Sequence, residues 1–441
     1  MSLFQLTASI TKAAADLEVA ANHAADAADI EARAKTALLD AAERLVLAYR
    51  TPRQWLIDLS FQHCATATLQ LIVKYRLHHA VPLQGSATYA DVADTVAASG
   101  KSSGVPATLV ERLLQHAMSF GLFTPASHGQ VAHNDASRLL ATDPDLEAWL
   151  YLCTNIAYPA GAQLPKAIET YGASSEPNET AYSVSIGQRL SQFEHLKSSP
   201  EGSEMFARAM KGISAGGAYD VAHVIDGGYP WHELKEGTLV VDVGGGPGHV
   251  SLALARKYPK LRFEIQDLAE TVEFGSRNCP DELKDRVSFR VHDFFKPQPG
   301  HHATDDRPVV FFARFILHDW SDKYAGQIVA AMAQGMRSQD RLVLNEVVIP
   351  EPGKAGLAAQ RIERKCHDRD LLMLMNLNGR ERTLSAFEGL FGAASPRLRV
   401  GRVHQPTTGG ELSLIEAVVD VGNKLKTHNG TNGISTVSNG A

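Results

Sequence analysis

The spacing of apolar residues divides the chain into two parts that meet near residue 237. Before that point, apolar side chains recur at helical spacing, as in the Ala-rich segment 4–49 and in 106–118. From 237 to about 421, short apolar or alternating runs are separated by helical stretches. This alternation predicts an α/β domain with a doubly wound parallel sheet. Its strands are predicted near 239–243, 262–266, 287–291, 309–313, 341–348 and 412–419, with a shorter one near 398–402.

The first 144 residues are predicted to form helices followed by a winged helix. One or two long helices over 4–49 should end before Thr51 and Pro52, because proline restricts the preceding residue to extended backbone. Further helices are predicted over 53–78, 89–97 and 106–118, followed by a hairpin near 129–133 and a helix at 136–140. Short helices followed by a β-wing are typical of a winged helix.

DNA binding is the function that a winged helix first suggests. The recognition helix would be 106–118, where the single Arg112 is balanced by Glu111, so it could not neutralise many phosphates. We therefore interpret residues 1–144 as a dimerisation and packing module. The long N-terminal helices could pack on a partner chain or on their own domain equally well.

Length, charge and cysteine usage narrow the class of protein. A chain of 441 residues suits two or three domains, and a net charge of -6 argues against a generic nucleic-acid binder. The four cysteines stand singly, without the spacing of a zinc site or disulfide framework, which indicates a reducing compartment. We see no secretory leader and no apolar run of membrane-spanning length, so a cytoplasmic protein is predicted. The tail 423–441, rich in Asn, Gly, Ser and Thr, is predicted to be disordered.

A glycine loop follows the first predicted strand. Residues 241–248 read Val-Asp-Val-Gly-Gly-Gly-Pro-Gly, with Asp242 in the strand and Gly244, Gly246 and Gly248 at alternate positions. Glycine adopts positive φ and has no Cβ, so this backbone can turn sharply and approach a ligand closely. The dinucleotide fingerprint instead has two residues between its last two glycines. The acid and the tighter spacing resemble the S-adenosylmethionine (SAM) loop of class I methyltransferases, and an ordinary tight turn is the alternative.

Acidic residues after the next two strands extend the candidate cofactor site. Asp267 ends its strand about twenty residues past the glycines, where nucleotide-binding folds hold ribose hydroxyls. Asp293 follows the third strand and could accept a hydrogen bond from an adenine amino group, with Phe294 against the ring. A helix cap is an equally good interpretation of Asp293.

Charged residues also occur at the fourth and fifth strands and beyond. Arg314 ends the fourth strand, and His318 follows just after it, where the reactive end of a cofactor should lie. A lone histidine is more often structural, but this position favours a functional role. Glu346 interrupts an apolar strand and should need a partner, whereas Glu381 could be ordinary surface charge.

These motifs together resemble a known family. The loop at 241–248, the block Ile-Leu-His-Asp-Trp-Ser-Asp at 316–322 and Glu-Arg-Thr at 381–383 are similar to SAM-dependent O-methyltransferases of the plant caffeic-acid type and of fungal polyketide pathways. Gly-Tyr-Pro-Trp at 228–231 favours the fungal branch. The resemblance covers nearly the whole chain. It implies a class I methyltransferase domain with a Rossmann-like sheet over 226–422, a helical linker over 145–225 that contributes to the substrate pocket, and a homodimer.

The resemblance also implies a role for each candidate residue. His318 would be the general base, with Glu346 and Glu381 flanking its imidazole. The residues that would hold SAM are Asp242, Gly244, Gly246, Asp267, Asp293, Phe294 and Arg314. The residues that would line the substrate pocket are Phe206, Met210, Met373 and Asn376. No metal is implied. Arg314 replaces a lysine of the plant enzymes, which keeps the charge but changes the geometry of the donor. Ile213 replaces a histidine and the loop before Glu381 is one residue shorter, and these two departures leave the substrate less defined than the reaction.

The implied reaction is methyl transfer to a phenolic or enolic hydroxyl of an aromatic, polyketide-like metabolite. The methyl group of SAM is already activated by its sulfonium, so a neutral imidazole need only accept the hydroxyl proton as the oxygen attacks. A methyltransferase-like pericyclase or dehydratase that uses SAM non-reactively is the alternative, although such a protein would tend to lose the histidine. A winged-helix regulator that binds a small molecule is a third interpretation, which the acidic charge disfavours.

Overall fold

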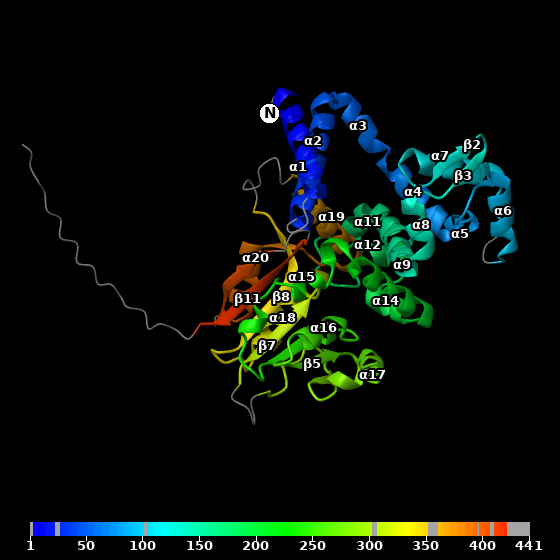
Figure 1. The fold of residues 1–441 in the computed structure, drawn as a ribbon. Helices are drawn as coiled ribbons and strands as arrows, with labels where there is room; N and C mark the ends of the chain where they lie inside the picture. The colour runs from blue at the N-terminus through cyan, green and yellow to red at the C-terminus, as the bar shows by residue number, and fades with distance from the viewer. Residues whose placement is uncertain are drawn as a thin grey trace, which may run out of the picture.

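The computed structural model describes residues 3–22, 27–100, 104–301, 307–351, 360–395, 397–405 and 410–420. The predicted disordered tail at 423–441 lies outside these residues. Figure 1 shows a pair of N-terminal helices, a lobe of short helices with a small sheet, and a large α/β body.

The N-terminal helices α1 (Leu3–Asn22) and α2 (Ala27–Tyr49) pack against each other, and α3 (Pro52–Ser60) leads from them to the lobe (Figure 1). Thr51 caps α3 by accepting a hydrogen bond from the Gln54 backbone N–H at 3.2 Å. The prediction of one helix over 53–78 is wrong. The segment breaks into α3, α4 (Gln62–Lys74) and α5 (Leu77–Ala80), with Arg76 at a φ of 56°. A bond from Arg76 to Glu147 at 3.0 Å holds that break, and no glycine or proline signals it.

The lobe contains the predicted helices and hairpin. Its helices are α6 (Tyr89–Ala98), α7 (Ala107–Ser119) and α8 (Asp135–Thr142). An antiparallel sheet pairs β1 (Ala87–Thr88), β3 (Gln130–Ala132) and β2 (Thr124–Ser127) in that order. Apolar side chains such as Ile72, Val110 and Leu114 fill the core between them. The assignment of this lobe as a winged-helix dimerisation domain stays a prediction.

The segment that follows is helical, as predicted for 145–225. It comprises α9 (Pro144–Tyr151), the π-helix η1 (Leu152–Ala157), α10 (Tyr158–Ala162), α11 (Leu164–Tyr171), α12 (Ala181–Ile186), α13 (Gln192–Lys197), α14 (Pro200–Ser214), η2 (Gly217–Tyr219) and α15 (Ala222–Ile225). In this segment, α14 packs chiefly against α9. A short turn, η3 (Trp231–Glu233), then leads into the α/β body.

The large sheet has the strand order β10-β11-β8-β7-β4-β5-β6. Its strands are β4 (Leu239–Val243), β5 (Arg262–Asp267), β6 (Val287–Val291), β7 (Val309–Arg314), β8 (Arg341–Ile349), β10 (Leu398–His404) and β11 (Leu412–Val419), and β9 (Arg382–Thr383) pairs with β8. All seven predicted strands are confirmed. The predicted parallel pairing is confirmed for β4, β5, β6, β7 and β8, whereas β10 and β11 pair antiparallel with their neighbours. Their connection is too short for the crossover that parallel pairing requires.

Two cores cover the two faces of this sheet. Successive side chains of a strand point to opposite faces, so Val240 and Val241 of β4 enter different cores. One core packs under α18 (Asp322–Ala333) and α20 (Leu384–Ala394), and the other under α16 (His249–Lys257). The carboxyl ends of the parallel strands therefore meet at one edge of the sheet, where α/β folds place ligands.

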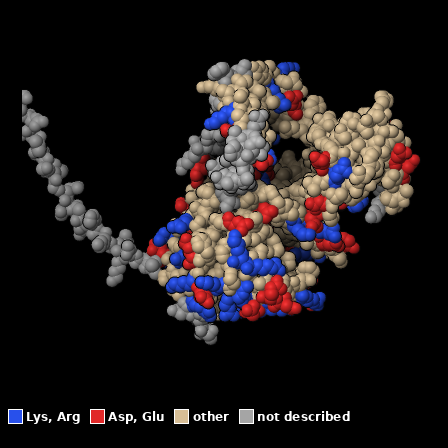
Figure 2. Space-filling view, viewed as in Figure 1, with Lys and Arg blue, Asp and Glu red and all other residues tan. Residues whose placement is uncertain are grey.

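The surface of the molecule mixes both signs of charge. On the face in Figure 2, basic and acidic side chains are interspersed over the α/β body, and the lobe carries few basic ones. This face therefore offers no continuous basic surface. Among the described residues, no helix combines the length and the apolarity needed to cross a membrane.

Candidate active site

His318 lies in a short 3-10 turn, η5 (Leu317–Asp319), directly after β7. The chain reverses at Phe315, whose φ is 53°, and the ring of Phe315 lies 5.1 Å from the ring of His318. Oε1 of Glu346 accepts hydrogen bonds from the N–H groups of Ile316 at 3.0 Å and Leu317 at 2.8 Å. The prediction that Glu346 needs a partner is therefore confirmed: the carboxylate of β8 holds the turn that carries His318.

Three carboxylates surround the imidazole of His318. Nδ1 lies 3.0 Å from Oε1 of Glu381, and Nε2 lies 3.4 Å from Oδ1 of Asp319. The polar atoms of His318, Glu346 and Glu381 lie within 4.8 Å of one another. Glu381 thus contacts the imidazole, while Oε1 of Glu346 is held by the backbone and its buried Oε2 has no hydrogen-bond partner among the described residues. Sequence reasoning missed Asp319, because an acid beside a histidine in the chain need not lie beside its ring.

The carboxylates determine the protonation of this cluster. Burial alone would lower the pKa of His318, but the charges of Asp319 and Glu381 outweigh it and raise the pKa to about 10. Burial raises the pKa of Glu346 to about 7 and that of Asp319 to about 6, although His318 opposes both shifts. These carboxylates therefore favour an imidazolium at neutral pH.

The buried Arg382 fixes the loop between His318 and α18. Its side chain is 1% exposed and donates to the carbonyls of Leu317 and Trp320, both at 2.8 Å, and to Oδ1 of Asp322 at 3.0 Å. The Glu-Arg-Thr motif at 381–383 predicted a role for Glu381 and none for Arg382. The sequence shows no sign that this arginine is buried, because its partners come from a distant segment.

The glycine loop after β4 takes the backbone conformation that its sequence predicts. Gly244, Gly246 and Gly248 have φ values of 70°, 60° and 89°, which L side chains rarely adopt. A Cβ on Gly244 would lie 2.6 Å from Cδ1 of Ile316, so the loop is packed directly against the turn that carries His318. A Cβ on Gly246 would meet nothing within 4 Å, so open space lies above that residue.

Two carboxylates, Asp242 and Asp267, lie next to this loop. Asp242 is 3% exposed and accepts a hydrogen bond from Oγ of Ser251 at 2.6 Å. Burial raises the pKa of Asp242 to about 6. Oδ2 of Asp267 accepts from the Gly246 N–H at 2.9 Å. Asp242 also contacts the loop, because a Cβ on Gly245 would lie 2.6 Å from its Cγ. Asp267 lies beside the open space at Gly246.

Asp293, Phe294 and Arg314 lie at the same edge of the sheet. Oδ1 of Asp293 accepts from the Phe295 N–H at 3.0 Å in an Asx turn, and residues 292–301 form no helix that Asp293 could cap, so the helix-cap interpretation is wrong. The ring of Phe294 lies edge-on to Trp320, and its Cδ1 would be 3.8 Å from a Cβ on Gly244. Arg314 donates to the Tyr219 carbonyl, its Nε is buried without a partner, and burial lowers its pKa to about 10.

The four predicted substrate residues form two pairs on different helices. Met373 and Asn376 occupy one face of α19 (Gln360–Leu377), and the buried Oδ1 of Asn376 has no hydrogen-bond partner. Phe206 and Met210 share a face of α14 and pack with Ala148 of α9. The second pair thus packs against a hydrophobic core.

Two groups of histidines and carboxylates in the described chain have the spacing of metal ligands. The first is His318, Glu346 and Glu381, where two backbone N–H groups already occupy one oxygen of Glu346. The second is His78, His79 and Glu147 in the lobe, where Arg76 already supplies a cation to Glu147. Neither geometry requires a metal ion.

Comparison with known proteins identifies the family. The O-methyltransferase domain family matches residues 169–395. O-methyltransferase elcB of Phaeosphaeria nodorum is 75% identical over 423 residues, which cover 95% of each chain. The chain belongs to the O-methyltransferase family. O-methyltransferase CTB2 of Cercospora beticola is 56% identical over 412 residues, covering 92% of this O-methyltransferase and 87% of the relative.

Solved structures share the fold of this O-methyltransferase at lower identity. OxaC in complex with S-adenosylhomocysteine (SAH) and oxaline has a TM-score of 0.71 at 20% identity, covering 94% of this chain and 100% of that one. LepI in complex with SAM has a TM-score of 0.69 at 21% identity, covering 95% and 100%. A pericyclic reaction enzyme has a TM-score of 0.70 at 20% identity, again covering 95% and 100%. These likenesses place the fold among class I methyltransferases.

Proposed function

We propose that this O-methyltransferase transfers a methyl group from SAM to a phenolic or enolic hydroxyl of an aromatic, polyketide-like secondary metabolite, with His318 as the general base. One observation carries the proposal: the glycine loop packs directly against the turn that presents His318, through Gly244 and Ile316. A ligand seated on the loop and a hydroxyl beside His318 would therefore be neighbours.

The described residues fit SAM. Gly246 has open space at a positive φ, Asp267 lies beside it, and Arg314 keeps a buried N–H donor without a partner. We propose Gly244, Gly246, Asp267, Asp293, Phe294 and Arg314 as its binding residues, with Asp242 acting through the loop. When bound, SAM supplies an activated methyl group next to a positive charge. The fungal O-methyltransferases that the chain matches and the solved LepI and OxaC complexes support this assignment.

The residues around His318 suit proton transfer from a hydroxyl. Glu381 contacts Nδ1 and so favours a proton there, which leaves Nε2 to accept the proton of the substrate. The pKa of His318 must fall for this step, because the surrounding carboxylates raise it to about 10. A positive charge beside the ring disfavours the imidazolium, so a cationic cofactor in the pocket would lower that pKa.

The alternative is a pericyclase or dehydratase that keeps SAM unreacted. The fold of the pericyclic reaction enzyme and the raised pKa of His318 favour it, since an imidazolium is a proton donor. At 20% identity, that likeness concerns the fold alone. The 75% identity to an O-methyltransferase favours methyl transfer.

We further propose that the chain forms a homodimer in the cytoplasm. Large apolar side chains are exposed along α2 and α3 and at the junction of α3 with α4, among them Leu47 at 49%, Leu56 at 63% and Phe61 at 64%. A second copy of the chain would cover such a surface. The four cysteines are free, which fits a reducing compartment.

Methyl transfer from isotopically labelled SAM to a panel of phenolic polyketides tests the proposed function. We expect label in an organic-soluble product with the wild type and with the control His232→Gln, whose side chain is 71% exposed. His318→Gln should lose the transfer. An unlabelled product of altered retention would instead favour the pericyclase, and full activity of His318→Gln would refute the base assignment.

A further inference from the structure

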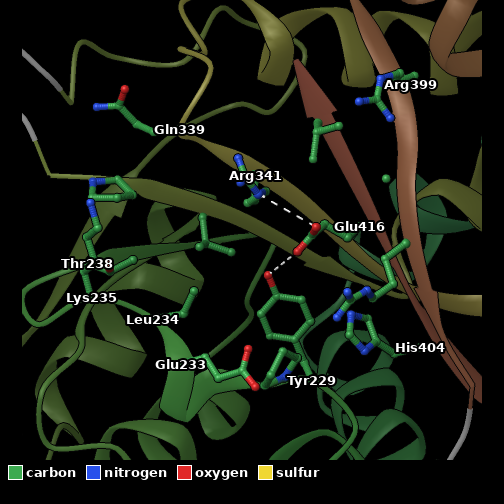
Figure 3. Close-up of a pocket in the computed structure, with 16 residues that line it drawn as sticks. Tyr229, Glu233, Leu234, Lys235, Thr238, Gln339, Arg341, Arg399, His404 and Glu416 are labelled. Carbon is green, nitrogen blue, oxygen red and sulfur yellow. Dashed lines mark hydrogen bonds and ion pairs between the residues drawn. The ribbon is translucent and has the colours of Figure 1, made fainter. Parts of the chain in front are cut away.

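A cavity lies at the end of the large sheet opposite His318. It has a volume of about 570 Å³ and is lined by the starts of β4, β7 and β8, by β10 and β11, and by the segment around η3 (Figure 3). The carboxyl ends of the same parallel strands hold the candidate active site, so this cavity is a separate site. Its size suits a small organic molecule.

A β-bulge in β10 directs two arginines into this cavity. Arg399 pairs with Val418 of β11 and Arg402 with Glu416, and the register shifts between Val400 and Arg402. The extra residue, Gly401, shifts the alternation of side chains along β10 by one position. Arg399 and Arg402 therefore lie on the same face of the sheet, although they are three positions apart. Both arginines line the cavity.

The cavity carries more positive than negative charge. Its basic residues are Lys235, Arg341, Arg399 and Arg402, against the carboxylates of Glu233 and Glu416. Glu416 is already engaged, because it accepts from the Tyr229 hydroxyl at 2.6 Å and lies 3.8 Å from Nε of Arg341 (Figure 3). Within the part of the chain that the structure describes, the side chains of Lys235, Arg399 and Arg402 make no hydrogen bond or ion pair. These three cations are therefore available to a ligand.

Two buried polar atoms of the lining also lack partners. Thr238 is fully buried, and its Oγ1 makes no hydrogen bond. Nε2 of His404 is likewise buried without a partner. A buried polar atom without a partner has lost the hydrogen bonds that water would give it, so such atoms call for an explanation. A ligand with oxygen acceptors would supply their missing bonds.

The Gly-Tyr-Pro-Trp motif at 228–231 forms one wall. Tyr229 and Pro230 line the cavity, and Trp231 is buried beneath them. Gly228 permits this packing, because a Cβ there would lie 2.1 Å from the His223 carbonyl oxygen. Leu234 and Val310 add further apolar lining. The cavity thus combines cationic side chains with an apolar surface.

We propose that this cavity binds a small organic anion through a phosphate or polycarboxylate group. The guanidinium groups of Arg399 and Arg402 present planar pairs of N–H donors, which match the oxygens of phosphate and carboxylate. Lys235 adds a third positive charge, and the Thr238 hydroxyl adds a buried donor. The apolar wall contacts the body of the ligand.

Calorimetric titration of the full chain with pyrophosphate and with citrate tests this site, at an ionic strength held constant with KCl. We expect saturable binding to the wild type and affinity about tenfold weaker in Arg399→Gln/Arg402→Gln. The control is Arg112→Gln/Arg262→Gln, which removes two exposed arginines outside the cavity and should bind like the wild type. Tighter binding of pyrophosphate identifies a phosphate-bearing ligand, and tighter binding of citrate identifies a polycarboxylate.

The proposal is overturned if the wild type binds neither probe saturably, or if the cavity variant binds as tightly as the control. Should the double arginine variant fail to fold, Thr238→Val provides the same test. It keeps the shape of the side chain and removes only an unpaired hydroxyl. We expect its affinity to fall severalfold, and an unchanged affinity would count against the site. None of these measurements depends on methyl transfer.

Discussion

Oδ1 of Asp319 lies 3.4 Å from Nε2 of His318, on the side of the imidazole opposite the nitrogen that Glu381 contacts. Both ring nitrogens therefore have a carboxylate beside them. This arrangement favours the doubly protonated ring, and it raises the pKa of His318 to about 10 against the effect of burial. Without a second positive charge in the pocket, the imidazole of the proposed base is therefore protonated and cannot accept a proton.

We predict that the cofactor-free protein loses stability as the pH rises from about 4 to about 10. The folded-state pKa of His318 is raised from 6.5 to about 10, so its contribution is full below pH 6.5 and is lost as the pH rises to about 10. The pKa of Glu346, raised from 4.5 to about 7, acts in the same direction at lower pH, as does that of Asp319. Thermal unfolding across this range measures the effect. His318→Gln should flatten the decline above pH 7, and an equally steep decline would contradict the prediction.

The same charges predict a pH-dependent preference between SAM and SAH. SAM brings a sulfonium cation into a pocket that already holds the His318 imidazolium, whereas SAH is uncharged at that sulfur. Raising the pH from about 7 to about 10 should therefore strengthen SAM binding relative to SAH, by at most about tenfold per pH unit. Calorimetric titration of both ligands checks this. In His318→Gln the ratio of the two affinities should no longer depend on pH.

Two glycines of the loop offer a matched test of its packing. Gly244→Ala places a methyl group 2.6 Å from Ile316, whereas Gly246→Ala meets nothing within 4 Å. Both residues have positive φ, so each alanine costs about 1 kcal/mol of backbone strain. We expect Gly244→Ala to add about 1–3 kcal/mol from overpacking and to slow methyl transfer by displacing the turn of His318. Chemical denaturation and kinetics measure both effects, and equal losses in the two variants would contradict a contact between loop and turn.

The apolar pattern of the sequence predicted the large sheet accurately. Every predicted strand is present, because buried strands such as β4 and β7 are short apolar runs bounded by turn residues. The antiparallel pairing of β10 and β11 was missed, since apolar spacing carries no direction. The break at Arg76 was also missed, because a contact with Glu147 in another helix stabilises it.

Part of the candidate site could be predicted in the same way. An acid inside an apolar strand needs a partner, which explains why Glu346 was predictable from its neighbours in sequence. Arg382 was not, because its burial depends on carbonyls of the loop that ends at Trp320. The bulge that turns Arg399 and Arg402 to one face also depends on pairing with β11, which no local pattern specifies.

We predict that Arg382→Lys destabilises the fold by about 2–4 kcal/mol. A lysine has one nitrogen and cannot reach the carbonyls of Leu317 and Trp320 and the Asp322 carboxylate together, so buried acceptors lose their donors. Arg380→Lys is the control, because its ion pair with Asp322 is exposed and should be worth about 0.5 kcal/mol or less. Urea denaturation of the two variants gives the comparison. Similar free energies of unfolding would show that Arg382 does not brace the loop.

The exposed apolar face of α2 and α3 predicts how the chain assembles. Leu56 and Phe61 are 63% and 64% exposed, and burying such side chains against a second copy contributes about 1.5–3 kcal/mol each. We expect the wild type to sediment as a dimer and Leu56→Glu/Phe61→Glu to sediment as a monomer, because the variant places carboxylates in that contact. The matched control is Leu268→Glu/Phe274→Glu, where Phe274 is 61% exposed on α17 (Ala269–Arg277), and it should remain dimeric. A wild type that sediments as a monomer, or a Leu56/Phe61 variant that stays dimeric, would place the assembly surface elsewhere.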